Sequence, residues 1–152
     1  MTIQSAHQTG KFVQTAQAFC ELIENHPAMS DTAFFSTCTQ LLAFLYGDAL
    51  DLPDVAPCEQ AVSEPAIAEE SQRALEALGV RLGSRDALLF DDLRDIYLDL
   101  RRGLDFHVSD ADCGRREALW TWKFLFYAHW GKHAAHAFGI LHERISEPIT
   151  HA

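Results

Sequence analysis

The sequence predicts an all-α protein, an antiparallel bundle of four principal helices and one accessory helix, with a long aromatic C-terminal helix at its centre. Apolar residues recur at helical spacing in several separate segments. No segment reads as a strand of convincing length. The 152 residues, 48% hydrophobic and 22% charged, fit a single globular domain over residues 1–152 that can bury a real core.

The first two helices are predicted from their apolar spacing and their boundary residues. The first runs from about residue 9 to 25, and His26-Pro27 ends it. Ser30 or Asp31 then caps a second, strongly apolar helix. The buried face of this second helix is Phe34, Phe35, Cys38, Leu41, Leu42, Leu45 and Tyr46. We expect it to pack directly on the central helix.

The middle of the chain predicts a long connection and two further helices. Residues 47–65 contain Pro53, Pro57 and Pro65 among acidic and small residues, which is typical of a connection over the surface. Residues 66–82 have only a thin apolar stripe, so we expect the accessory, peripheral helix there. The fourth principal helix covers residues 87–106. Its buried face is Phe90, Leu93, Ile96, Tyr97, Leu100 and Leu104.

The final helix is predicted to span residues 110–146 and to be buried among the others. It contains all three tryptophans and is apolar almost all round, which is typical of a central helix. An S-x-x-D signal at Ser109 and Asp112 starts it. Its small residues, Gly131, Ala135 and Gly139, share one flank where another helix could approach closely, although a glycine here could also mark a break. Residues 1–8 and 147–152 are expected to be frayed tails.

Charge and cysteine spacing exclude several classes of protein. Twenty-two acidic against 12 basic residues give a formal net charge of −10, which argues against nucleic acid or a membrane surface as a partner. The cysteines are far apart and show no zinc-type spacing, so we expect no disulfide framework. They are Cys20, Cys38, Cys58 and Cys113. Without a signal peptide or an apolar run of roughly 18 residues, a cytoplasmic protein is expected.

Three histidines on one face of the final helix are candidate metal ligands. His129, His133 and His136 follow i, i+4 and i+7, so their imidazoles can point the same way. A metal site in a helical bundle also needs ligands from a facing helix, and the sequence has no Glu-x-x-His half-site. The alternative is that these histidines line the core or a groove and bond to acidic neighbours.

Acidic residues of the fourth helix offer a second candidate site. Asp92, Asp95 and Asp99 lie at i, i+3 and i+7, and either nearby arginines or the histidines of the central helix would be their partners. A ligand pocket between residues 87–106 and 110–146 would then be lined by Asp95, Tyr97, Asp99, Trp130 and His133. The alternative is a solvated face with ion pairs inside the helix. An aromatic pocket could be lined by Trp120, Trp122, Trp130 and Tyr127, but in a bundle such residues are more often part of the core.

Two segments of the C-terminal third carry a family resemblance. The first is an Asp-Ile-Tyr-x-Asp-Leu helix at Asp95, Ile96, Tyr97, Asp99 and Leu100. The second is a Trp-Gly-x-His core at Trp130, Gly131 and His133. With these motifs the chain, from Lys11 onward, resembles a bacterial family, domain of unknown function 5063. His129 and His136 are not part of its pattern. The resemblance implies a small helical cytoplasmic protein with no assigned activity.

Two functions are therefore expected as alternatives. The first is a protein-interaction or regulatory module, binding another protein or itself, with no catalytic activity and no cofactor of its own. The absence of a nucleophilic triad and of glycine-rich nucleotide loops favours it. The second is a bundle that binds a divalent metal or a small ligand between residues 87–106 and 110–146.

Overall fold

The structure, a computed structural model, describes residues 3–60, 62–109 and 112–150, and all its regular elements are helices. The α-helices are α1 (Ile3–Asn25), α2 (Asp31–Leu50), α3 (Glu69–Leu82), α4 (Ala87–Ser109), α5 (Cys113–Ala128) and α6 (Trp130–Thr150), with a short 3-10 turn, η1 (His26–Ala28). The all-α prediction is confirmed over these residues. No helix among them is long and apolar enough to cross a membrane.

Several helix boundaries differ from those expected. Helix α1 begins at Ile3 and α6 continues to Thr150, so residues 3–8 and 147–150 are helical. The Ser30 cap of α2 is confirmed, because its hydroxyl accepts the N–H of Ala33 at 3.2 Å. The expected cap at Ser109 is wrong: α4 extends through Ser109, whose hydroxyl donates to the Phe106 carbonyl at 2.9 Å. The predicted start near residue 110 lies outside the described residues, and α5 begins at Cys113.

The predicted single helix over residues 110–146 is wrong, because it breaks at His129. The backbone there has φ −144° and ψ −82°, which is not helical. At Gly131 a Cβ would lie only 2.2 Å from the Phe126 carbonyl oxygen, so the chain can turn here only with glycine. Ala135 and Gly139 are exposed, so the predicted flank of close approach is also wrong.

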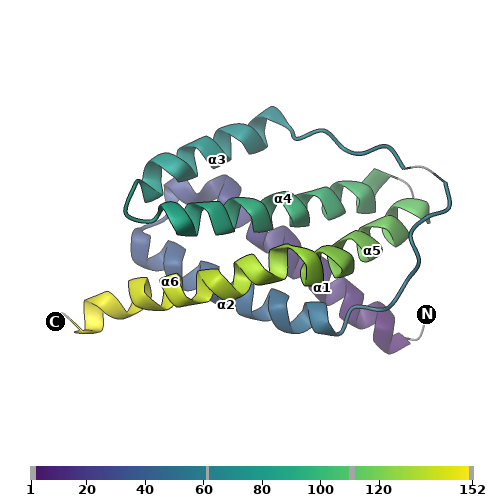
Figure 1. Ribbon diagram of the computed structural model, residues 1–152, viewed down its shortest axis with the longest axis horizontal. Helices are drawn as coiled ribbons and strands as arrows, with labels where there is room; N and C mark the ends of the chain where they lie inside the picture. The colour runs from purple at the N-terminus through teal and green to yellow at the C-terminus, as the bar shows by residue number, and fades with distance from the viewer. Residues whose placement is uncertain (1–2, 61, 110–111, 151–152) are drawn as a thin grey trace.

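The helices α5 and α6 follow one another along the length of the molecule (Figure 1). Helix α4 packs against both of them, and α2 packs against α6. The accessory helix α3 lies at the edge in Figure 1 and packs on α1 and α4. Its buried residues are Ser71, Leu75, Leu78 and Leu82. The arrangement therefore places the α5–α6 junction beside the middle of α4.

Aromatic side chains of the broken segment fill the core. Trp122 and Trp130 are fully buried, and Phe12 of α1 packs against both rings at centroid distances of 5.2 and 6.2 Å. Each indole N–H is satisfied, since Trp122 donates to the Leu100 carbonyl at 3.1 Å and Trp130 to the Trp122 carbonyl at 3.0 Å. Both tryptophans thus combine a large buried area with paired polar groups.

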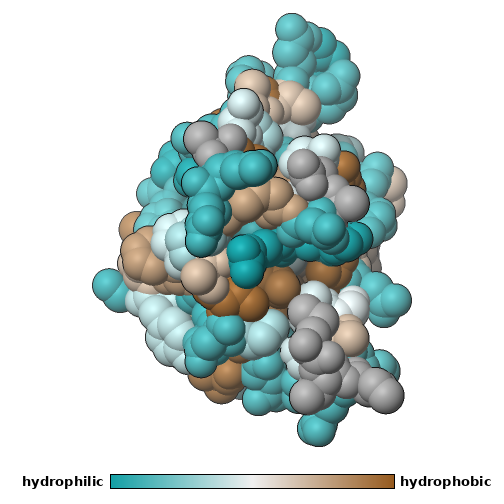
Figure 2. All heavy atoms as spheres, turned by 90° about the vertical axis from the view of Figure 1, so that its right-hand side faces the viewer, coloured by the Kyte–Doolittle hydropathy of each residue, from teal (hydrophilic) through white to brown (hydrophobic). Residues whose placement is uncertain are grey.

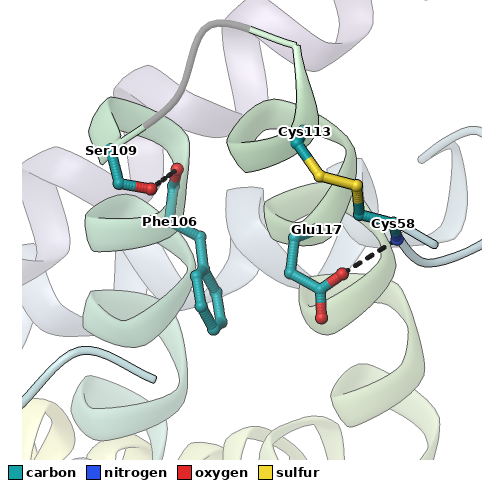
Figure 3. The surroundings of a disulfide bond; sticks show 5 residues. All are labelled: Cys58, Phe106, Ser109, Cys113 and Glu117. Atoms are coloured by element: carbon teal, nitrogen blue, oxygen red, sulfur yellow. Dashed lines mark hydrogen bonds between the residues drawn. A yellow bond between two sulfur atoms is a disulfide. The ribbon is translucent and has the colours of Figure 1, made fainter. Parts of the chain in front are cut away.

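A disulfide joins Cys58 to Cys113 across a Cα–Cα distance of 5.6 Å, which overturns the expectation of no disulfide (Figure 3). The sequence spacing is uninformative here, because the connection between α2 and α3 brings Cys58 back to the start of α5. The expectation holds for Cys20 and Cys38, which are buried free thiols. Burial raises the pKa of both thiols.

Candidate metal centre

Aspartates on one face of α4 meet histidines at the junction of α5 and α6, and we call these six residues the Asp–His cluster. The aspartates are Asp92, Asp95 and Asp99. Their spacing of i, i+3 and i+7 places them on one side of α4. The histidines are His129, at the helix break, and His133 and His136, on α6. Packing of α4 against α6 brings the two sets into contact.

The first contact holds the histidine at the helix break. Nδ1 of His129 lies 2.6 Å from Oδ2 of Asp99. Burial raises the pKa of Asp99, and the hydrogen bond with His129 opposes that rise. An ionised carboxylate can only accept hydrogen bonds, so Nδ1 carries a hydrogen, and in the neutral ring, the form that binds a metal, the lone pair is then on Nε2. Asp99 therefore fixes both the tautomer and the direction of this imidazole.

A second aspartate holds the other two histidines. The two oxygens of Asp92 lie 2.8 Å from Nδ1 of His133 and 2.5 Å from Nδ1 of His136. The side chain of Asp92 is only 6% exposed, so these two bonds are its means of compensating for lost hydration. As with Asp99, the carboxylate accepts from Nδ1, so in the neutral form of each ring Nε2 is the acceptor.

Asp95 completes the arrangement from the middle of the face. Its Oδ1 accepts two bonds from Arg94, from Nε at 3.1 Å and from Nη2 at 3.0 Å. Its Oδ2 lies 3.3 Å from Nε2 of His133 and 3.8 Å from Nε2 of His129. Oδ2 of Asp95 and the Nε2 atoms of two imidazoles therefore face one another.

This geometry fits a transition-metal ion. One ligand atom from each of Asp95, His129 and His133 lies within 4.8 Å of the others, and no other group of three candidate ligands meets this condition in the described parts of the chain. Zinc binds His nitrogen and carboxylate oxygen at about 2.0–2.2 Å, so neighbouring ligand atoms of a tetrahedral ion are about 3.3 Å apart. The Asp95–His133 pair has this separation. Nε2 of His129 lies slightly further out, 3.8 Å from the same carboxylate oxygen, so this ring would move inward to bind the same ion.

Only part of the predicted five-residue pocket comes together. Asp95, Asp99 and His133 meet in the Asp–His cluster, whereas Tyr97 and Trp130 do not. Tyr97 points to the other side of α4, where its hydroxyl lies 2.8 Å from Ser71 and 2.9 Å from Glu24. Its position is two residues from both Asp95 and Asp99, and residues two apart do not face each other on a helix. Trp130 is buried in the core.

The predicted set of three histidines is also divided. His129 and His133 are in ring contact, with centroids 4.8 Å apart, and share the carboxylate of Asp95. His136 lies outside this group of ligands and contacts Asp92 instead. Arg94, which orients Asp95, was expected only as an ion-pair partner. The sequence offered one indication that Arg94 belongs to the site, namely its position next to Asp95.

The aromatic residues of α5 divide between core and surface. Trp122 is in the core, whereas Phe124 and Tyr127 are 53% and 60% exposed. The rings of Trp120 and Phe124 stack nearly parallel, 5.1 Å apart with an interplanar angle of 9°. A cavity of about 220 Å³ lies between these rings and Pro53 of the connection. We call Trp120, Phe124 and Tyr127 the aromatic face. The prediction of a core position is wrong for Tyr127, and Trp120 is only half-buried.

The comparisons with known proteins agree with the resemblance seen in the sequence. The family model described as domain of unknown function 5063 matches residues 83–146, which confirms that resemblance. The matched range contains all six residues of the Asp–His cluster. No curated protein matches the chain.

A solved structure supports the fold. The chain is similar to the crystal structure of protein BF1032 from Bacteroides fragilis, a structural genomics target, with a TM-score of 0.78 and 23% sequence identity. The alignment covers 88% of this chain and 92% of that one. At this identity the likeness concerns the helical fold alone.

Proposed function

We propose that this protein binds a divalent transition-metal ion through Asp95, His129 and His133. The observation that carries the proposal is the orientation of all three ligands by other residues. Asp99 holds Nδ1 of His129, Asp92 holds Nδ1 of His133, and Arg94 holds Oδ1 of Asp95. A carboxylate behind each metal-binding imidazole is a recurrent feature of metal centres, because it fixes the ring and raises its basicity.

The ligand set favours certain metals. Two imidazole nitrogens and one carboxylate oxygen suit zinc, iron, cobalt or nickel better than magnesium or calcium, which prefer oxygen ligands. Three protein ligands leave at least one position for water or another small ligand. His129 and His133 have 43% and 28% of their side chains exposed, so such a ligand can reach the site. The proposal assigns metal binding and no reaction.

Metal titration tests the proposal. Protein freed of metal with a chelator is titrated with Zn²⁺ by calorimetry and with Co²⁺ by visible absorption. We expect one ion per chain, and at least a 10-fold loss of affinity in each of His129→Ala, His133→Ala and Asp95→Ala. His142→Ala is the matched control, because His142 is an exposed histidine of the same helix outside the cluster. No binding by the parent protein, or equal losses in the control, would refute the site.

Protein interaction is the second candidate function, and the aromatic face favours it. Aromatic residues are enriched in protein interfaces, and the described residues place Phe124 and Tyr127 largely in solvent. Sedimentation velocity over a range of concentrations tests self-association. This function is supported if the mass of the parent protein rises with concentration while the double variant Phe124→Ala/Tyr127→Ala stays monomeric. A monomer at all concentrations removes self-association from consideration.

A further inference from the structure

The connection between α2 and α3 lies across α5 and is attached to it at two places. At the first, Nζ of Lys123 donates to the carbonyl of Leu52 at 2.6 Å and pairs with Asp54 at 2.7 Å. At the second, the Cys58–Cys113 disulfide ties the connection to the first residue of α5, and the N–H of Cys58 donates to Glu117 at 3.0 Å (Figure 3). Of these attachments only the disulfide is covalent, so it limits how far the residues between them can move from α5.

The attached segment borders a cavity. Val55 lies between the two attachments and packs against the core. Val55 lines a cavity of about 310 Å³ together with Ala6 and Leu119, and polar residues, among them His107 and Arg116, complete the lining. Figure 2 looks onto this end of the molecule and shows hydrophobic atoms between hydrophilic ones. Release of the segment would expose this apolar surface.

The disulfide is accessible from solvent. Cys58 and Cys113 are half-buried, and a second cavity of about 570 Å³ borders both sulfur-bearing residues. Its other lining residues, Glu59, Gln60, Asp112 and Arg116, are exposed. A small thiol can therefore reach the bond without unfolding of the helices, whereas Cys20 and Cys38 are fully buried.

The two sulfurs differ as leaving groups. Cys113 is the first residue of α5, and the positive end of the helix dipole favours a negative charge there. Arg116 lies one turn further along the same helix, and the acidic Asp112 is paired with Arg115 at 2.8 Å. Cys58 belongs to an irregular segment and has no such stabilisation from a helix. Thiol–disulfide exchange is faster when the better-stabilised thiolate leaves.

We propose that Cys58–Cys113 is a site of thiol–disulfide exchange with dithiol reductants, and that exchange releases the connection from α5. The thiolate of the reductant attacks Sγ of Cys58, the S–S bond breaks, and Cys113 leaves as a thiolate that takes a proton from water. In the mixed disulfide, the first sulfur of the reductant is bonded to Sγ of Cys58. The second thiol of the reductant, as a thiolate, then attacks that first sulfur. Cys58 leaves as a thiolate and is protonated, so the protein gains two electrons and two protons while the dithiol becomes a disulfide.

Native-state alkylation tests the exchange. The full chain, purified in air, is incubated with increasing dithiothreitol, quenched with iodoacetamide without denaturant, and weighed by mass spectrometry. We expect two added groups, mapped to Cys58 and Cys113, with Cys20 and Cys38 unmodified until urea is added. Protection of these two core thiols and an unchanged circular dichroism spectrum show that the fold persists. Reduction only in urea, or a purified protein with four free thiols, would overturn the proposal.

Limited proteolysis tests the release. We expect cleavage between residues 53 and 68 to be at least 10-fold faster after reduction, and to be fast in both oxidising and reducing conditions in Cys58→Ser/Cys113→Ser. The double variant separates loss of the disulfide from other effects of the reductant. Equal cleavage rates in oxidised and reduced protein would show that the connection stays on α5 without the disulfide, and would overturn the release.

Discussion

Oδ2 of Asp95 lies 3.3 Å from Nε2 of His133, although the two residues belong to different helices. Each partner is held from behind, Asp95 by Arg94 and His133 by Asp92. Two residues held in this way lose little conformational freedom when a ligand binds between them. The cluster is therefore organised before any ion binds. Substitutions of the residues that hold the ligands should consequently change metal affinity, as substitutions of the ligands do.

Asp92→Asn should weaken metal binding without removing a ligand. The amide oxygen can accept from one imidazole and the amide nitrogen cannot accept from the other, so His133 and His136 compete for one acceptor and the orientation of His133 is less well fixed. We expect a 10- to 100-fold loss of Co²⁺ affinity, measured by absorption titration. Asp91→Asn removes the same charge from an exposed carboxylate that lies 3.8 Å from Arg94. An equal loss in both variants would attribute the effect to net charge alone.

Tyr97→Phe should destabilise the fold and leave the metal site intact. The hydroxyl is buried between Ser71 and Glu24, on the side of α4 opposite the Asp–His cluster. Its removal leaves a buried hydroxyl on Ser71 with one partner fewer, which costs about 1–2 kcal/mol in urea denaturation. Co²⁺ affinity should stay within about twofold. A large loss of Co²⁺ affinity would show that Tyr97 contributes to metal binding.

Gly103→Ala and Gly139→Ala should have opposite effects on stability. A Cβ at Gly103 would lie 2.0 Å from Nε1 of Trp122, whereas at Gly139 it would meet nothing within 4 Å. Alanine favours a helix over glycine by about 1 kcal/mol, so Gly139→Ala should be stabilising. Overpacking at Gly103 should cost about 1–3 kcal/mol, because α4 and α5 must move apart. Urea midpoints measure both, and a stabilised Gly103→Ala would contradict the contact.

Acid should destabilise the protein through His26. Burial and the neighbouring Arg81 lower the pKa of His26 below its ordinary value of 6.5. The unfolded chain therefore takes up a proton below pH 6.5 that the folded chain refuses. The stability contributed by the neutral ring is complete above that pH and is lost as the pH falls, with a slope of up to about 1.4 kcal/mol per pH unit.

The matched variant for this effect is His26→Asn, which keeps an acceptor near Arg81 and does not titrate. Unfolding free energies between pH 5 and 7.5 should fall less steeply in this variant than in the parent protein. Burial and the neighbouring Arg115 also lower the pKa of His107, so this residue likewise makes the protein less stable as the pH falls. The variant His107→Asn should therefore reduce part of the remaining slope of unfolding free energy against pH. Identical slopes in all three proteins would contradict the assignment.

Much of the fold could be predicted because helix formation depends on the spacing of residues over short stretches of the sequence. The apolar spacing of α2 and α4 and the Ser30 cap of α2 depend only on residues a few positions apart in the sequence. The break at His129 could not be predicted in this way. Gly131 was visible in the sequence, but a glycine in an apolar helix serves close packing or a break equally well, and only the carbonyl of Phe126 decides between them.

The sequence by itself determined which residues could meet. It placed Asp92, Asp95 and Asp99 on one side of a helix and put histidines at matching intervals further along. Only the tertiary structure decided the pairing: the packing of α4 on α6 assigns Asp99 to His129 and Asp92 to His133. It also joined Cys58 to Cys113. The reason is physical, because periodicity orients side chains about their own helix axis, whereas contacts between distant residues depend on how whole helices and connections pack.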